Sequence, residues 1–225
     1  MKALIFTLLL TAVSFALFGQ AHTTHNQFKN DLRRQKFKGK VATVTENEYN
    51  AQGDSLKLRS VSKYDDNGNQ ISFFTYSPSG TVQSKTAFKY NDSGKLVEEL
   101  RYKADGSLNV KTTCKYDEKG NKIEEYNYDE SGTLFMKVAS KFDGKGNRIV
   151  KDSYNEFGAL FLKCNSKFDD DGNEVLAKEY DSHHGLKFTT TYEYDDMDRA
   201  GNWLRRTTYK NDDPATVTVR EIEYH

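Results

Sequence analysis

Acidic and amide side chains recur just before glycine in this sequence, as in YDDNGN at 64–69 and FDDDGN at 168–173. Carboxylate and amide oxygens are ligands that Ca²⁺ prefers in proteins. Calcium loops of the EF-hand kind place acids at alternate positions so that the side chains converge on one ion, whereas the acids here are consecutive. A turn explains every copy, because Asp or Asn bonds forward to the backbone and Gly adopts the positive φ that follows. We therefore expect turns here and assign no metal ligands.

Two adjacent histidines, His183 and His184, interrupt this pattern at a turn beside Asp181. Adjacent side chains of a strand face opposite ways, but in a turn both rings could bind one metal ion. No further ligand set is visible in the sequence, so a variation of a surface loop is the favoured interpretation. We single out the pair as a repeat irregularity and predict no metal and no cofactor.

Nucleophilic catalysis requires a base near a Ser, Thr or Cys side chain. All histidines lie at the ends of the chain or in that one turn, far in sequence from both cysteines. They are His22, His25, His183, His184 and His225. Paired carboxylates such as Glu98 and Glu99 are consecutive, so they face opposite sides of a strand. A site assembled across strands leaves no trace in sequence, but these residues favour a protein that is not an enzyme, and we assign no catalytic residue.

The aromatic residues repeat with a period of 26, which sets the architecture. One series is Tyr64, Tyr90, Tyr116, Phe142, Phe168 and Tyr194. A second series is Tyr76, Tyr102, Tyr128, Tyr154 and Tyr180. Each 26-residue unit therefore has two similar halves, and in both an aromatic residue is followed by three residues and then Gly.

The residues between the turns alternate in polarity with a period of two, which is the signature of β-strands. In the longer half of the repeat one face is largely apolar, as at Leu134, Met136 and Val138, and the other carries lysines. Two rows of lysines result, one at Lys85, Lys111, Lys137 and Lys163 and one at Lys89, Lys115, Lys141 and Lys167. Lysines in rows are typical of a solvated face.

The shorter half is less regular. Ile123 stands three residues after a glycine, and Tyr128 closes the half five residues later. Five is an odd number, so the two side chains point to opposite faces unless a bulge intervenes. The sequence leaves both arrangements open.

Turns every 12 to 14 residues without a helical period predict sequential antiparallel strands, roughly fourteen from residue 41 onward. A sheet of that width must twist, curl or close. With 36% hydrophobic residues and a mean hydropathy of −0.82, the chain cannot fill a thick two-layer core. We therefore predict, for 41–225, an all-β antiparallel β-meander repeat array, built from a 26-residue double-hairpin repeat and forming an elongated or curled single sheet.

This arrangement makes a prediction about the two cysteines. Cys114 and Cys164 lie two repeats apart, which is about 19 Å in a regular meander. A disulfide requires Cα atoms within about 7 Å. We expect both cysteines to be unpaired and half-buried.

The N-terminal region divides into two segments, 1–21 and 22–40. At the start of 1–21 a single Lys precedes an apolar run that ends in small residues, which predicts a secretory signal peptide cleaved near Gly19 to Ala21. No later segment approaches the roughly 20 apolar residues of a spanning helix, so we predict a secreted or periplasmic protein without a membrane span. The segment 22–40 holds six basic residues against one acid, and we interpret it as a basic N-terminal arm or capping helix on the first repeat.

The charge of the remaining chain bears on its partners. Removing Lys2 and 22–40 from the 33 basic and 33 acidic residues leaves 26 basic and 32 acidic ones. A mildly acidic body disfavours nucleic acid as a partner. An arm that binds an acidic surface is the alternative interpretation of 22–40.

Three segments resemble a known family of repeats: KYDDNGN at 63–69, KYDEKGN at 115–121 and YEYDDMDRAGNW at 192–203. They are similar to the Tyr-Asp (YD) repeats of RHS-type proteins, teneurins and insecticidal toxin-complex shells, over about 64–210. The resemblance implies secretion and a β-hairpin array that curls, in long members, into a hollow shell. This chain has too few repeats to enclose a cargo and lacks the self-cleaving core after Asp213-Pro214, so encapsulation and autoproteolysis are not expected.

The second aromatic series has two interpretations. Cross-strand aromatic pairs hold sheets together, and that structural role is favoured. The alternative is a ligand surface at Tyr76, Tyr102, Tyr128 and Tyr154, where amphipathic rings beside lysines would bind a sugar or a protein. We therefore expect a secreted, non-enzymatic binding module for protein or glycan at a bacterial cell envelope. A structural envelope protein that self-associates through its sheet face or edges is the alternative, and an enzyme is the third.

Overall fold

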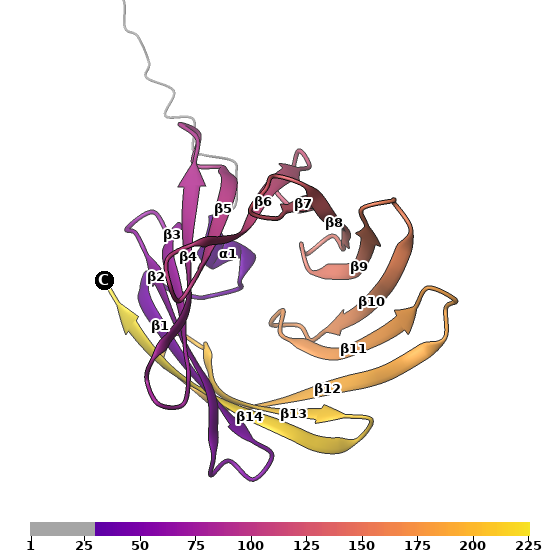
Figure 1. Ribbon diagram of the computed structural model, residues 1–225. Coiled ribbons are helices and arrows are strands. Elements are labelled where there is room, and N and C mark those ends of the chain that lie inside the picture. The colour runs from indigo at the N-terminus through magenta and orange to yellow at the C-terminus, as the bar shows by residue number, and fades with distance from the viewer. Residues whose placement is uncertain (1–29) are drawn as a thin grey trace, which may run out of the picture.

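The computed structural model describes residues 30–225, which form one short helix and fourteen strands (Figure 1). The predicted signal peptide at 1–21 and the start of the predicted arm at 22–29 lie outside the described residues. The elements are α1 (Asp31–Arg34), β1 (Val41–Asn50), β2 (Leu56–Tyr64), β3 (Gln70–Tyr76), β4 (Val82–Tyr90), β5 (Leu96–Lys103), β6 (Leu108–Tyr116), β7 (Lys122–Tyr128), β8 (Leu134–Phe142), β9 (Arg148–Asn155), β10 (Leu160–Phe168), β11 (Glu174–Asp181), β12 (Leu186–Met197), β13 (Trp203–Lys210) and β14 (Asp213–Tyr224).

The sheet closes on itself, and this overturns part of the predicted fold. The all-β class and the antiparallel order of sequential strands hold, but β1 also pairs with β14, from Val41 opposite Tyr224 to Asn50 opposite Thr216. The predicted elongated or curled single sheet is therefore wrong, because the structure is a closed barrel. Closure pairs the hydrogen-bonding groups of the two end strands, which an open sheet would leave as exposed edges.

Bulges next to the turns bend the strands and help to close the sheet. Opposite the adjacent pair Lys115 and Tyr116, β7 has Glu124 and Lys122, so Ile123 is an extra residue. The same shift recurs where β2 meets β3, β4 meets β5, β8 meets β9 and β10 meets β11. A bulge therefore intervenes between Ile123 and Tyr128, which settles the question that the sequence leaves open. Bulges increase local twist and bend a strand, and repeated bulges of this kind curve a sheet.

The turns have the predicted chemistry. In the β6–β7 turn the Asp117 carboxylate accepts a hydrogen bond from the backbone N–H of Asn121 at 2.8 Å, and Gly120 has φ 77°. Asp143 and Asp169 make the same bond to Asn147 and Asn173. These acids serve backbone geometry. Within residues 30–225 no group of three or more His, Cys, Asp or Glu side chains is placed to hold a metal ion.

The β11–β12 turn differs from the turns that precede it, because His184 takes the left-handed position that glycine takes in them, with φ 64°. A side chain at such φ is strained. We expect His184→Gly to raise the free energy of unfolding by about 1 kcal/mol, as measured by chemical denaturation. His183→Gly is the matched control. His183 has no such φ, so its replacement should destabilise the protein slightly by the entropy of glycine. Equal effects of the two substitutions would contradict the strain at His184.

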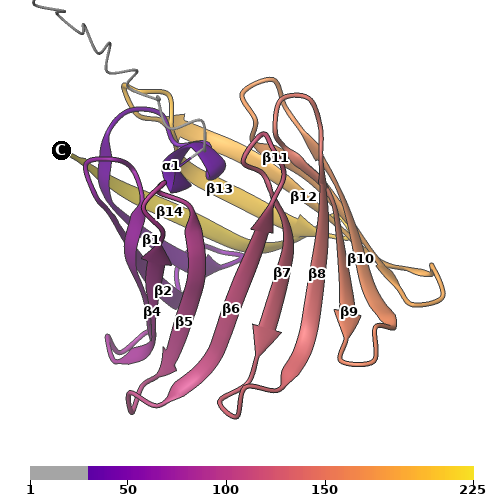
Figure 2. The same cartoon turned by 90° about the horizontal axis from the view of Figure 1, so that it is seen from above.

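Residues 30–40 cover one mouth of the barrel. Figure 2 shows α1 at the end formed by the turns after β2, β4, β6, β8, β10 and β12. We call this the plugged end, the opposite mouth the far end, and residues 30–40 the plug. Both cysteines are free and half-buried, as predicted. Among residues 30–225 no helix is long and apolar enough to cross a membrane.

Candidate ligand-binding site

The plug crosses the mouth and contacts turns from both sides of the barrel. The backbone N–H of Leu32 donates to the Gly68 carbonyl at 3.1 Å in the β2–β3 turn. The Lys36 ammonium lies 3.2 Å from the Lys145 carbonyl in the β8–β9 turn. The plug therefore joins the β2–β3 turn to the β8–β9 turn, which lies three repeats further along the chain.

A buried carboxylate anchors the plug to the wall. Asp31 is 5% exposed and accepts a hydrogen bond from the backbone N–H of Gln70 at 2.8 Å. The Tyr90 hydroxyl and the Arg34 guanidinium also donate to this carboxylate. Burial raises the pKa of Tyr90 well above its usual value, and the charge of Asp31 raises it further. Charge-assisted bonds to a buried carboxylate are among the stronger hydrogen bonds in proteins.

An apolar cluster seals the plug against the first strands. Leu32, Val41, Val44 and Tyr64 are buried together, and Phe37 packs against them. The Tyr64 hydroxyl then donates to the Gln35 side chain at 2.6 Å. The plug is thus held by packing as well as by Asp31.

β12 has 12 residues, whereas β2, β4, β6, β8 and β10 have 9 each, but the turn after β12 is not longer. The turn from Asp198 to Asn202 has the same backbone bonds as the other turns. Asn202 in this turn contacts the plug, where it accepts from the Lys38 N–H at 2.8 Å and donates to the Lys38 carbonyl at 2.9 Å. These two bonds fix the plug shortly before the chain enters β1.

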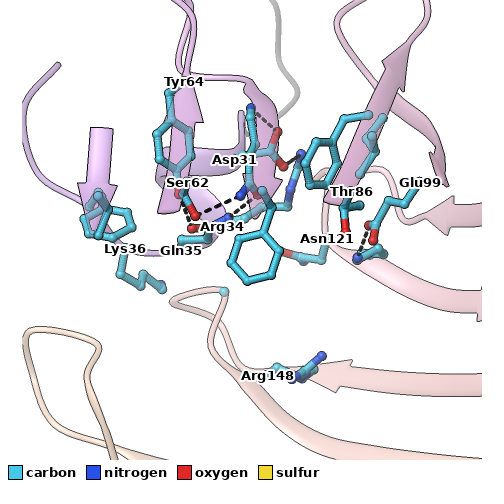
Figure 3. Close-up of a pocket in the computed structure, with 18 of the residues that line it drawn as sticks. Asp31, Arg34, Gln35, Lys36, Ser62, Tyr64, Thr86, Glu99, Asn121 and Arg148 are labelled. Carbon is cyan, nitrogen blue, oxygen red and sulfur yellow. Dashed lines mark hydrogen bonds and ion pairs between the residues drawn. The ribbon is translucent and has the colours of Figure 1, made fainter. Parts of the chain in front are cut away.

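A cavity of about 560 Å³ lies inside the barrel beneath the plug (Figure 3). Four phenylalanines from four strands line it: Phe73, Phe88, Phe142 and Phe168. Polar side chains such as Thr86, Asn121 and Arg148 stand between them. The site therefore combines ring faces with hydrogen-bonding groups.

Charged side chains form a network on the β5–β9 wall of this cavity. The Lys122 ammonium lies 3.1 Å from Glu99 and 3.5 Å from Glu125, and Arg148 lies 4.0 Å from Glu125. Burial acts to lower the pKa of Lys122, but the two carboxylates more than offset it and hold that pKa above its usual value. These ion pairs join β5, β7 and β9 and order the wall. Arg101 also lines the cavity.

The predicted ligand tyrosines lie on the other side of the sheet. Tyr102, Tyr128 and Tyr154 are half-buried and stand opposite Lys85, Lys111 and Lys137, and Tyr76 stands opposite Arg59. Lys111 and Lys137 form outer-face ion pairs with Glu98 and Glu124. The four tyrosines therefore form one line on the outer face and do not reach the cavity. His183 and His184 are exposed in a far-end turn, away from both sets.

Sequence reasoning missed the charged residues of the lumen. Three of them, Lys122, Arg148 and Glu174, occupy the first strand position after the plugged-end turns, where earlier repeats have Gln70 and Leu96. This position therefore changes from polar to apolar to basic to acidic along the chain. This variation at one register position could have marked the residues as a candidate site. Because closure of the sheet was not predicted, the sequence did not indicate that these residues face one another.

The fold and site together define a closed, fourteen-stranded antiparallel barrel with one plugged mouth and a mixed aromatic and charged cavity. Among solved structures, a porin-like protein from Bacteroides uniformis matches at 10% identity and a TM-score of 0.49, over 81% of this chain and 98% of that one. The Photorhabdus luminescens Tc holotoxin pore matches at 15% identity and a TM-score of 0.27, over 72% of this chain and 9% of that one. TcdB2-TccC3 matches at 15% identity and a TM-score of 0.31, over 73% of this chain and 10% of that one. No family model and no curated protein matches the sequence.

Proposed function

We propose that this chain is an exported, non-enzymatic binding module that takes a glycan into the lumen of its barrel. The observation that carries the proposal is the cavity of about 560 Å³ beneath the plug. Its volume lies in the range of small-molecule sites, roughly 300–1,000 Å³. Aromatic faces can stack on the apolar faces of sugar rings, and Thr86, Asn121 and Arg101 offer hydrogen bonds to hydroxyls.

The outer face supports an aqueous location at the cell envelope. The side chains of Lys111 and Lys115 are 42% and 65% exposed on it. Each lysine on a lipid-facing surface would cost up to about 2–4 kcal/mol at the bilayer midplane. We therefore propose that the barrel works in water outside the cytoplasm, after the predicted signal peptide at 1–21 has been removed. The YD-repeat relationship remains a proposal that rests on the three resembling segments.

A protein partner on the outer face is the second candidate function. The observation that favours it is the line of half-buried tyrosines from Tyr76 to Tyr154 beside lysines. An open sheet could self-assemble through its two edge strands. In this barrel β1 and β14 pair with each other, so self-assembly through strand edges has less support. Association through the outer face would use the same tyrosines.

Binding to an array of oligosaccharides, followed by titration calorimetry, tests the primary proposal. Phe168 lines the cavity from β10, and we expect Phe168→Ala to weaken binding about tenfold, which corresponds to about 1.4 kcal/mol of lost stacking. Phe161→Ala is the matched control on the same strand, because Phe161 is 44% exposed and does not line the cavity. It should leave affinity unchanged.

A double variant, Tyr102→Ala with Tyr128→Ala, distinguishes the two candidates. If the ligand binds in the lumen, this variant should bind it with unchanged affinity. Loss of binding in that double variant, with Phe168→Ala unaffected, would move the site to the outer face and refute the lumen proposal.

A further inference from the structure

Arg206 is a partly buried cation without an ion-pair partner among residues 30–225. It lies on β13, and its Nε is buried without a hydrogen-bond partner in that part of the chain. One of its amino groups lies 3.4 Å from the Thr218 hydroxyl, and the Tyr194 hydroxyl is beside it. Both neighbours are neutral, so neither offsets the positive charge of the guanidinium.

Arg206 lines a second cavity, of about 200 Å³, between the plug and β11–β13. The cationic side chains around it are Arg34, Lys36, Lys38, Arg206 and Arg220. The carboxylates around it are Asp171 and Glu174, and Asp171 pairs with Lys38 at 3.2 Å. Basic groups thus outnumber acids around this cavity.

Three other cations of the cavity, Arg34, Lys38 and Arg220, have their own acids. The Arg220 guanidinium lies 2.7 Å from Glu46, and Arg34 pairs with Asp31. Buried charges in proteins are normally paired, because an unpaired one loses its hydration without compensation. Among residues 30–225 no carboxylate lies within ion-pair distance of Arg206, so its charge fits a counter-ion supplied by a ligand.

Aromatic rings hold the Arg206 guanidinium in place. It lies over Tyr192 and Trp203, 5.3 and 5.1 Å from their ring centroids. A planar guanidinium fixed in this way is prepared for bidentate bonds to a carboxylate, sulfate or phosphate. The two cavities share Phe37, Phe168 and Arg220 in their walls, so one ligand can reach both.

We propose that the ligand of the lumen carries an anionic group, a carboxylate or a sulfate, which binds Arg206 in the second cavity. This inference rests on the proposed glycan function and specifies its ligand class as an acidic sugar. Glu174 stands in the same cavity and repels that group, so its removal strengthens binding. Binding weakens as salt screens the attraction between Arg206 and the anion.

Calorimetry on the full exported chain tests this with four probes: a neutral oligosaccharide, its uronate-containing and its sulfated counterparts, and free sulfate. We expect the acidic sugars to bind at least about tenfold more tightly than the neutral one. Arg206→Gln should remove that preference, and Arg206→Lys should retain some of it, because it keeps the charge but loses the planar fork. Arg205→Gln is the matched control, since Arg205 is the adjacent residue, stands opposite Asp195 on β12 and does not line the second cavity. Glu174→Gln should tighten the binding of acidic sugars.

The outcomes separate this inference from the function on which it rests. Equal binding of neutral and acidic sugars, unaffected by Arg206→Gln, overturns the anion site and leaves the glycan function standing. Free sulfate binding as tightly as the sulfated sugar, and lost in Arg206→Gln, supports an anion site but overturns the acidic-sugar ligand. No binding of any sugar refutes the glycan function and the acidic-sugar ligand with it. Thermal melts monitored by circular dichroism test whether each variant is folded. If Arg206→Gln does not fold, the comparison of Arg206→Lys with the unchanged protein still tests the anion site.

Discussion

Asp31→Asn is expected to lower the free energy of unfolding by about 3 kcal/mol, because the buried carboxylate collects bonds from three donors. An amide has one acceptor oxygen and an NH₂ group, so at least one donor then faces another donor. Gln70 and Tyr90 belong to β3 and β4, and therefore the loss falls on the contact between the plug and the first repeats. Denaturant unfolding measures the change.

Asp171→Asn is the control for the loss of charge alone. Its carboxylate also pairs with the plug, at Lys38, but its side chain is 71% exposed. Exposed pairs contribute about 0–1 kcal/mol, so this substitution should cost less than a third as much as Asp31→Asn. Similar costs for both substitutions would show that burial of Asp31 does not anchor the plug.

Local features of the fold could be predicted from the sequence because they depend on neighbours along the chain. The Asp117 to Gly120 turn is one example, since its bonds span only four residues. The lysine rows are another, because strand alternation alone places Lys111 and Lys137 on one face. Glu98 and Glu99 do separate, with Glu98 paired outside and Glu99 in the lumen wall.

Closure could not be predicted in this way. It depends on the pairing of β1 with β14, whose residues are far apart in sequence and carry no complementary motif. The position of each bulge could not be predicted either, although the odd spacing from Ile123 to Tyr128 allowed for a bulge in that half of the repeat. The accumulated bend of many bulges decides whether a sheet curls or closes.

The candidate site follows from closure, and so it was hidden as well. Phe73, Phe142 and Phe168 come from strands on different sides of the ring, and only a closed barrel places them around one space. The tyrosines from Tyr76 to Tyr154 were identifiable because they repeat. Arg206 was not, because it has no counterpart in the repeat and Tyr192 of β12 meets it only across the sheet.

Cysteines placed at Asn47 and Val219 are expected to form a disulfide in nearly every molecule. These positions are direct partners on β1 and β14, whereas in an open sheet of this width the end strands would lie on the order of 60 Å apart. The pair is introduced with Cys114→Ser and Cys164→Ser, so that no native thiol competes. Cross-linking of so long a segment should stabilise the barrel by about 5 kcal/mol in the chain-entropy description, measured by unfolding with and without reductant.

The control pair tests register as well as closure. Cysteines at Asn47 and Arg205 are separated by two strand spacings, about 9.6 Å, because both positions stand opposite Val219 on β14, which lies between β1 and β13. They exceed the span of a disulfide and should remain reduced under the same mild oxidation. If Asn47→Cys with Val219→Cys also stayed reduced, β1 and β14 would not be paired, and the closed lumen proposed as the binding site would not exist.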